Sequence, residues 1–256
     1  MKVLVLGHGG MLGHSVVRYY KKHGDHVLTS PHRWPRKRFT DTIESFNGDL
    51  IINCVASNPQ KSDDFKINYE LPIFIANNIQ EGVKYIHPET DGIFKGDLPK
   101  GRLYDKYLPG DATDRYGISK AVSKKLKSRN TKVIRSSLIG LDKHNRYLLS
   151  WFLNQKFVKG YTNHYWNGIT VYHWAHISKK IFLEWSLHDY ITQVASECIS
   201  KADLLKVFNR VFDKKIKITE LEHNTTINRC LQPDIKLPVI EIQLKEYLKD
   251  IKEGSI

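Results

Sequence analysis

The chain has 256 residues, of which 41% are hydrophobic and 11% aromatic, and it carries a formal net charge of +13. This composition excludes the disordered, collagen-like and low-complexity classes. The length predicts one large domain or one domain with a smaller annex. The basic residues are dispersed, with short clusters at 33–38 and 124–129. The charge therefore favours a solvated lysine-rich surface with some cations facing phosphorylated ligands, and nucleic-acid binding is the weaker interpretation.

The cysteines and the apolar runs bear on the compartment. Cys54, Cys198 and Cys230 lie far apart and form no C-x-x-C motif, which argues against a disulfide framework or a structural zinc site and favours a reducing compartment. The apolar run at residues 3–6 is too short for a signal-peptide core. No apolar stretch approaches the ~20 residues of a membrane helix. We therefore expect a soluble cytoplasmic protein that binds no membrane.

Short apolar segments alternate with helical segments through the first half of the chain. Apolar strands between helices indicate a parallel sheet covered on both faces. The alternation thus predicts the α/β class, with a doubly wound parallel sheet. Strands are predicted at residues 3–6, 26–29, 50–54, 85–86 and 132–135, and helices at 12–23, 68–80 and 116–128.

The pattern changes after about residue 139. No internal repeat or Pro/Gly-rich linker is visible, so we expect a lobe that packs on the first half. We predict one domain at 1–140 and a smaller lobe at 141–256, with some segments returning to the sheet. Helices are predicted at 148–157, 171–187, 200–212 (with Ser200 as N-cap) and along the tail at 240–251, and strands at 191–196 and 215–221.

The first strand runs into a glycine loop with the spacing of a dinucleotide site. Gly7, Gly10 and Gly13 form G-x-x-G-x-x-G, with an extra Gly9. Such glycines allow a tight turn, a close approach of the backbone to a pyrophosphate, and close packing of the helix on the sheet. The amides at the helix N-terminus then face the anion. An ordinary glycine turn is the alternative interpretation.

The end of the second strand bears on the choice of cofactor. No acidic residue stands there to hold the adenosine ribose. Ser30, His32 and Arg33 follow the strand instead, and an arginine at this place can pair with a 2′-phosphate. The pattern favours NADP(H) over NAD(H), with Arg33 as the main ligand; a solvated basic loop is the alternative.

Tyr116 and Lys120 form a Y-x-x-x-K motif. On a helix, residues i and i+4 share a face, so the phenol and the ammonium can point into one cleft. We expect the lysine charge to lower the pKa of the tyrosine towards the working range for proton transfer.

The glycine loop and the Y-x-x-x-K motif together resemble the extended short-chain dehydrogenases/reductases, and within them the dTDP-4-dehydrorhamnose reductase group. The resemblance implies a Rossmann-type fold, with a dinucleotide-binding domain at 1–140 and a smaller, mainly substrate-binding C-terminal lobe at 141–256. It also implies a nicotinamide cofactor and a catalytic trio. Tyr116 would give the proton, Lys120 would hold the nicotinamide ribose and lower the tyrosine pKa, and Thr90 would bind the reacting oxygen. Further matching stretches are N-C-V-A at 53–56, N-Y-E-L-P at 68–72, T-D-G-I-F-K-G at 90–96, and the softer W-N-G-I-T at 166–170 and N-R-C-L at 228–231.

The resemblance and the chemistry of individual side chains together predict the residues that bind. For the cofactor they are Gly7, Gly9, Gly10, Met11, Leu12, Gly13, Ser30, Arg33, Cys54, Ala56, Tyr116 and Lys120. For the substrate they are Thr90, Asp91, Trp166 and Arg229. Arginine suits bidentate contacts with phosphate, and a tryptophan can stack on a sugar or base. Lys156, Lys159 and Tyr165 are alternatives, and residues 160–168 form either a substrate-covering loop or a packed turn.

Fold alone does not fix the reaction. Dehydratases of this superfamily carry Thr-Asp-Glu where this chain has Thr90, Asp91 and Gly92, which argues against dehydration. Bifunctional epimerase–reductases use a Cys and a His near the sugar. No cysteine lies near Thr90 or Tyr116 in the sequence, although Cys54 is a candidate to approach. The missing acidic ribose ligand counts against a 4-epimerase with bound NAD.

We therefore predict NADPH-dependent reduction of the 4-keto group of a nucleotide-linked 6-deoxy sugar, in deoxysugar synthesis for a polysaccharide. The predicted partners are a nucleotide-sugar substrate and a second copy in a homodimer, without nucleic acid. A non-catalytic NADP-binding regulatory subunit and a nucleotide-sugar epimerase are the alternatives.

Three features depart from the family pattern or invite another interpretation. Glu89 stands where the family often has Ser, and it either alters the pocket or faces solvent. The run Ser-Lys-Lys at 123–125 stands where the family often has an acidic pair, and we interpret it as a solvent-exposed face of a helix. His173 and His176 have a spacing that can bind metal, but their helix more simply packs its apolar residues inward, and we predict no metal site.

Overall fold

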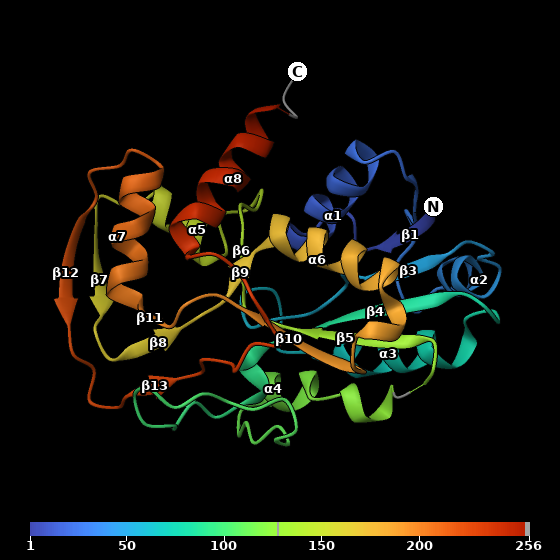
Figure 1. The fold of residues 1–256 in the computed structure, drawn as a ribbon, viewed down its shortest axis with the longest axis horizontal. Helices are drawn as coiled ribbons and strands as arrows, with labels where there is room; N and C mark the ends of the chain where they lie inside the picture. The colour runs from blue at the N-terminus through green and yellow to red at the C-terminus, as the bar shows by residue number, and fades with distance from the viewer. Residues whose placement is uncertain (127, 254–256) are drawn as a thin grey trace.

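The computed structural model describes residues 1–126 and 128–253. A seven-stranded sheet lies between two layers of helices, and a smaller lobe with its own short strands adjoins it, on the left in Figure 1. The strands follow the order β14-β10-β5-β4-β3-β1-β2, and every neighbouring pair is parallel. Their bounds are β1 Lys2–Leu6, β2 His26–Thr29, β3 Leu50–Asn53, β4 Lys84–Glu89, β5 Thr131–Arg135, β10 Ile191–Ala195 and β14 Ile235–Lys236.

The strands are apolar on both sides because helices cover both faces of the sheet. Val3 and Val5 of β1 belong to one core cluster, and Leu4 and Leu6 to the other, as the alternation of side chains along a strand requires. The predicted doubly wound parallel sheet is confirmed. The first cluster includes residues of α1 (Met11–Lys22), α6 (Val171–Leu183) and α8 (Ile240–Glu253), and the second those of α2 (Lys37–Glu44) and α3 (Ile67–Asn78).

The order of the strands identifies the edge of the sheet at which a ligand is expected to bind. β1 has β2 on one side and β3 on the other, so the direction in which the chain adds strands reverses between β1 and β3. Ligands of open α/β sheets bind outside the carboxyl ends of the strands at such a point. The glycine loop leaves β1 there.

The helix predicted at 116–128 is shorter than expected. α4 (Arg115–Lys120) ends where Ala121 adopts φ −76° and ψ 57°, and a 3-10 turn, η2 (Ser123–Lys125), follows. This turn brings the Ser123 N–H to Glu89 Oε1 at 3.4 Å, a bond that a continuous helix would not leave available. Lys127, also inside the predicted helix, lies outside the described residues.

The second half contributes both to the sheet and to the lobe. β10, β14, α6 and α8 join the sheet and its covering layer, and the Ser200 hydroxyl caps α7 by accepting from the Asp203 N–H at 3.1 Å, as predicted. None of the described helices is long and apolar enough to cross a bilayer. The remaining elements are η1 Asp91–Ile93, β6 Leu138–Ile139, α5 Leu148–Leu153, β7 Phe157–Tyr161, β8 His164–Trp166, β9 Ile169–Thr170, η3 Trp185–Leu187, β11 Ile199–Ser200, α7 Lys201–Val211, β12 Lys217–Leu221 and β13 Ile227–Asn228.

The prediction of a helix over 148–157 is wrong at its C-terminal end. α5 stops at Leu153, where the Asn154 amide donates to the Ser150 carbonyl at 2.8 Å. Phe157 instead begins β7, whose burial alternates along the strand as it pairs with β12. An apolar run this short does not separate helix from strand by its periodicity.

The expectation against a disulfide is also wrong. Cys198 and Cys230 are bonded, with their Cα atoms 5.9 Å apart, although 32 residues separate them in the sequence. Asn167 holds the turn after β10 and the segment after β13 together. Its backbone carbonyl accepts from the Ser196 N–H at 2.9 Å, and its side chain bonds both the N–H and the C=O of Leu231. Sequence spacing carries no information about this non-local contact.

Candidate active site

Close backbone packing requires glycine at two positions of the loop. Gly7 has φ +79°, and a Cβ there would lie 2.9 Å from the carbonyl carbon of Cys54. A Cβ on Gly13 would lie 2.2 Å from the Gly7 oxygen, so α1 could not approach the loop. Gly10 precedes α1, and no described side chain caps that helix start. The first amides of α1 are thereby left to serve an anion.

A cleft of about 390 Å³ lies against this loop. It brings together the three predicted catalytic residues and several predicted cofactor residues from distant parts of the sequence. Its lining comprises Gly10, Met11, Leu12, Cys54, Val55, Ala56, Asn58, Pro59, Gln60, Lys61, Pro88, Glu89, Thr90, Tyr116, Lys120, Ser136, Ser137, Leu138 and Tyr147.

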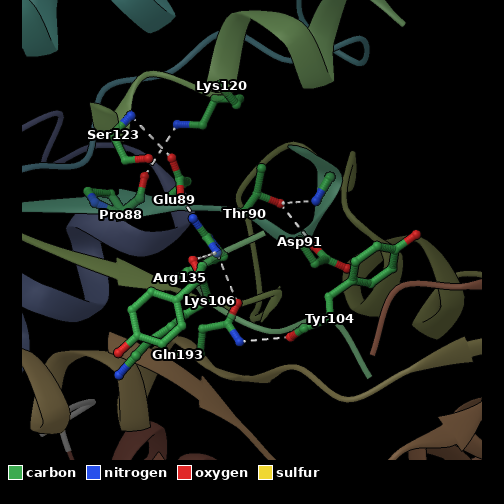
Figure 2. Close-up of polar contacts among 12 residues, drawn as sticks. Pro88, Glu89, Thr90, Asp91, Tyr104, Lys106, Lys120, Ser123, Arg135 and Gln193 are labelled. Atoms are coloured by element: carbon green, nitrogen blue, oxygen red, sulfur yellow. Dashed lines mark hydrogen bonds and ion pairs between the residues drawn. The ribbon is translucent and has the colours of Figure 1, made fainter. Parts of the chain in front are cut away.

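Thr90 stands at the end of β4, where the strand turns into η1. Its hydroxyl accepts from the Gly92 N–H at 3.1 Å and donates to Asp91 Oδ1 at 3.0 Å (Figure 2). These bonds fix the hydroxyl at the rim of the cleft. A Cβ on Gly92 would lie 3.4 Å from Tyr116 Cε1, an ordinary van der Waals contact, so the third position of the triplet adjoins the tyrosine ring.

Tyr116 is held as a phenol. Burial first, and then the charge of Asp91, raise its pKa to about 12, while a hydrogen bond with Thr90 acts in the opposite direction. Burial and the charge of Asp91 therefore outweigh any lowering of this pKa by the Lys120 charge. The Lys120 ammonium donates instead to the Pro88 carbonyl at 3.4 Å (Figure 2). A phenol that stays protonated at neutral pH suits a proton donor.

Lys120 is 5% exposed. Burial lowers its pKa to about 8, and the negative charge of Glu89 opposes that shift. The amine therefore changes charge close to physiological pH, which makes it a candidate functional group.

Glu89 does not face solvent. Its carboxylate accepts from Arg135 Nε at 2.7 Å, and Arg135 Nη1 donates to Gln193 Oε1 at 3.1 Å (Figure 2). The network continues from the Gln193 amide to the Tyr104 carbonyl at 2.9 Å. Ser123 also belongs to it and is buried, so the solvated face predicted at 123–125 is limited to the two exposed lysines. A satisfied buried ion pair thus ties β4, β5 and β10 together beneath the cleft.

Other predicted cofactor residues lie outside the cleft lining. Gly9 lines an adjoining cavity. Ser30 follows β2 and is buried, with its hydroxyl accepting from the His32 N–H at 3.3 Å. Arg33 is exposed on the same loop. Both residues stand at the carboxyl end of β2, next to β1, along the edge that a dinucleotide would follow.

The predicted substrate residues differ in burial and in the contacts that they make. Asp91 is buried beside Thr90. Trp166 is 4% exposed within the core, so it is not available to stack on a sugar as expected. A Cβ on Gly168 would meet its ring at 2.3 Å, which shows how closely the backbone packs there. Arg229 Nη2 donates to the Lys95 carbonyl at 3.4 Å.

Sequence reasoning missed several groups around the site. Lys201 lies over the Trp166 ring at 5.3 Å; burial lowers its pKa to about 8, with Asp91 opposing and Arg229 adding to the shift. The sequence feature that could have drawn attention to Lys201 is its position directly after Ser200, the predicted N-cap of a helix. Asn58 and Tyr147 line the cleft and are bonded at 2.8 Å across 89 residues, and no local pattern could have paired them.

The histidine pair is structural. His173 bonds the Thr170 hydroxyl through Nδ1 at 2.7 Å and Glu246 through Nε2 at 2.8 Å. His176 stacks on Tyr19. Over residues 1–126 and 128–253, no group of three His, Cys, Asp or Glu side chains could hold a metal ion.

The family model described as RmlD substrate binding domain matches residues 1–156. The chain belongs to this family. All cleft-lining residues of this RmlD-family chain precede residue 148 and so fall within the matched segment. The comparison with curated proteins gives no match.

Solved structures share the fold of this RmlD-family chain over its length. A dTDP-4-dehydrorhamnose reductase from Bacillus anthracis str. Ames in complex with NADP has a TM-score of 0.80 at 15% identity, covering 97% of this chain and 99% of that one. One from Clostridium acetobutylicum ATCC 824 gives 0.77 at 16%, covering 98% and 100%. A UDP-glucose 4-epimerase from Thermotoga maritima with UDP-glucose gives 0.73 at 14%, covering 100% of both chains. The predicted resemblance to extended short-chain dehydrogenases/reductases is confirmed.

Proposed function

We propose that the protein is an NADPH-dependent reductase of the 4-keto group of a nucleotide-linked 6-deoxy sugar. One observation carries the proposal: Thr90, Tyr116 and Lys120 line the same cleft as the glycine-loop residues Gly10 and Met11. A proton donor therefore lies in one cavity with a dinucleotide-binding loop.

The residues fit a nicotinamide dinucleotide. The uncapped start of α1 and the steric fit of Gly7 and Gly13 suit a pyrophosphate. Met11 and Leu12 would hold it, Cys54 and Ala56 would form the wall, and Ser30 and Arg33 would take the 2′-phosphate. The cofactor, when bound, supplies the hydride. The Bacillus anthracis reductase with NADP supports this choice.

The chain's own part in the reaction is proton transfer and orientation. Tyr116, protonated because its pKa is raised to about 12, donates its phenolic proton to the oxygen that becomes the alcohol. Thr90 would donate to the same oxygen once its hydroxyl proton turns away from Asp91 Oδ1, and would so fix the direction of that oxygen. Lys120 contributes positive charge below pH 8, which favours the tyrosinate left after transfer. Arg229 would contact the substrate phosphates, and Asp91 would steady Thr90.

Several finer expectations belong to the same proposal. They are a division into a dinucleotide domain at 1–140 and a mainly substrate-binding lobe at 141–256, a role in polysaccharide synthesis, a homodimer, and a cytoplasmic location. The Cys198–Cys230 disulfide removes the cysteine-based support for a reducing compartment, so the location rests on the proposed pathway. Residues 254–256 of the lobe lie outside the described residues.

The test follows NADPH oxidation with 4-keto-6-deoxy sugar nucleotides made in situ from dTDP-glucose and UDP-glucose. We expect consumption that requires the sugar, and loss of turnover by at least about a hundredfold in Tyr116→Phe, since general acid catalysis contributes about 10²–10⁴. NADPH binding should be unchanged in that variant. Full turnover in Tyr116→Phe contradicts the mechanism. NADPH binding without consumption favours a regulatory subunit, and isomerised sugar without net oxidation favours an epimerase.

A further inference from the structure

Tyr147 brings a second phenol into the cleft that holds Tyr116. It stands directly before α5, and hydrogen bonds hold its backbone on both sides. Its N–H donates to Asp142 Oδ1 at 3.2 Å, and its carbonyl accepts from the Trp151 N–H at 2.8 Å. The residue is half-buried. The backbone that carries this phenol is therefore fixed before any ligand binds, which suits a residue that recognises a substrate.

The hydroxyl of Tyr147 has one hydrogen-bond partner among residues 1–126 and 128–253. The Asn58 side-chain amide donates to the phenolic oxygen at 2.8 Å. A phenol both donates and accepts, so an oxygen that accepts from an amide keeps its own proton for another acceptor. Because Asn58 and Tyr147 both line the cleft, this bond leaves an O–H donor there that no described residue uses.

Asn58 is held as firmly as the phenol. The preceding residue, Ser57, exchanges two hydrogen bonds with the Asn68 side chain of α3, at 2.8 and 2.9 Å. The Asn68 amide also donates to the Ser119 hydroxyl at 3.0 Å, and Ser119 lies on α4, the helix of the Y-x-x-x-K motif. The amide that bonds the Tyr147 hydroxyl is thus tied to the helix that carries the proposed proton donor.

The two phenols of the cleft have separate partners. Tyr116 shares a hydrogen bond with Thr90, and the charge that Tyr147 can carry adds to the raised pKa of Tyr116, so the two phenols interact electrostatically. Tyr147 is bonded by Asn58 instead. Thr90 and Tyr116 already supply the donors for the reacting oxygen in the proposed mechanism. A third donor with its own partner therefore suits a different oxygen of the same ligand.

We propose that Tyr147 is a specificity-determining residue whose hydroxyl donates a hydrogen bond to a ring hydroxyl of the substrate sugar, with Asn58 as a positioning residue. The inference rests on the proposed function, because it requires a sugar nucleotide in the cleft. A nucleotide-linked 4-keto-6-deoxy hexose has its hydroxyls at C2 and C3, so one of these is the acceptor. A site built to bond a substrate hydroxyl discriminates against the analogue that lacks it.

The test measures calorimetric binding of product-like sugars, dTDP- and UDP-6-deoxyglucose, to the whole protein loaded with NADP⁺. We expect Tyr147→Phe to weaken binding by about threefold to tenfold, the range for one neutral hydrogen bond. The 2-deoxy or 3-deoxy analogue that lacks the contacted hydroxyl should bind the parent and Tyr147→Phe equally. Asn58→Ala should weaken binding less, because it leaves the phenol but not its orientation. The matched control is Tyr107→Phe, which removes a hydroxyl from a 79% exposed residue outside the cleft lining and should bind as the parent does.

The affinity for NADP⁺ separates a lost sugar contact from a folding defect, and it should be unchanged in Tyr147→Phe. A fall in NADP⁺ affinity with unchanged sugar affinity means that the hydroxyl serves the cofactor, and it overturns the inference. Equal sugar affinity in Tyr147→Phe and Tyr107→Phe also overturns it but leaves the reductase proposal standing. So does an equal loss for the parent sugar and both deoxy analogues, which indicates ring packing.

Two further outcomes are separable. If Tyr147→Phe does not fold, the same comparison of sugars in Asn58→Ala decides, and an unchanged affinity for every sugar overturns the inference. If no product-like sugar binds the parent protein, the proposed function itself is contradicted, and this inference falls with it. None of these measurements depends on turnover.

Discussion

Two sets of buried polar groups flank the cleft, and they differ in how completely the chain satisfies them. Beneath it, Glu89, Arg135 and Gln193 bond one another and the backbone. Beside it, Ser15 Oγ and Arg146 Nε have no partner among the described residues. A satisfied network stabilises one arrangement of the fold, whereas unsatisfied donors lower stability and are retained where something else binds. Lys120, with one long bond to a carbonyl, stands between these extremes.

The largest effect on stability is expected in the fully hydrogen-bonded network of Glu89, Arg135 and Gln193. Glu89→Gln leaves the Arg135 charge buried and unpaired, and breaking a buried ion pair in this way costs about 3–5 kcal/mol. Urea unfolding should show that loss in the free energy of unfolding. The double variant Glu89→Gln, Arg135→Met should recover a large part of it, because no charge is then stranded. An effect of Glu89→Gln below about 1 kcal/mol would mean that water reaches the pair and that the network does not organise the sheet beneath the cleft.

Register explains why this network was not foreseen. Glu89 and Arg135 face one another directly in the β4–β5 pairing, but the sequence places them 46 residues apart and gives no register. The glycine loop could be predicted because its strand, turn and helix are contiguous. The Y-x-x-x-K pair could be placed on one helix for the same reason. What needs long-range pairing, such as the disulfide or the contact of Asn58 with Tyr147, carries no local signal.

The short elements of the lobe were harder to predict from the sequence than those of the sheet. β1 and β3 are buried on both faces and read as continuous apolar runs, whereas β8, β11 and β13 have two or three residues each, too few to show a period. Trp166 illustrates the consequence: its sequence context suggests a ligand platform, but the strand that carries it buries the ring in the core.

A smaller effect of opposite sign is expected at Lys120. Burial lowers its pKa from 10.5 to about 8, and each pKa unit corresponds to about 1.4 kcal/mol, so Lys120→Met should raise the free energy of unfolding by roughly 3 kcal/mol at pH 7 while turnover is lost. Between pH 8 and 10.5 the unfolded state holds the proton that the folded state has released, so the parent protein should gain stability as pH rises through this window.

The pH dependence is the control for that prediction. In Lys120→Met the gain between pH 8 and 10.5 should become smaller but not vanish, because Lys201, whose pKa burial also lowers to about 8, still contributes to it. Urea unfolding at pH 7, 8.5 and 10 in both proteins measures it. If the parent protein shows no rise over this window, or the variant keeps the same rise, the amine is not held in a desolvated state.

The smallest effect on stability is expected at Ser15, one of the buried polar groups without a described partner. Its sign is opposite to that of the effect at Glu89. Ser15→Ala removes a buried hydroxyl without a partner and improves helix propensity, so the free energy of unfolding should rise by about 0.5–1 kcal/mol. A stability loss above about 1 kcal/mol would instead show that the hydroxyl has a structural partner, and it would move Ser15 into the class of Glu89.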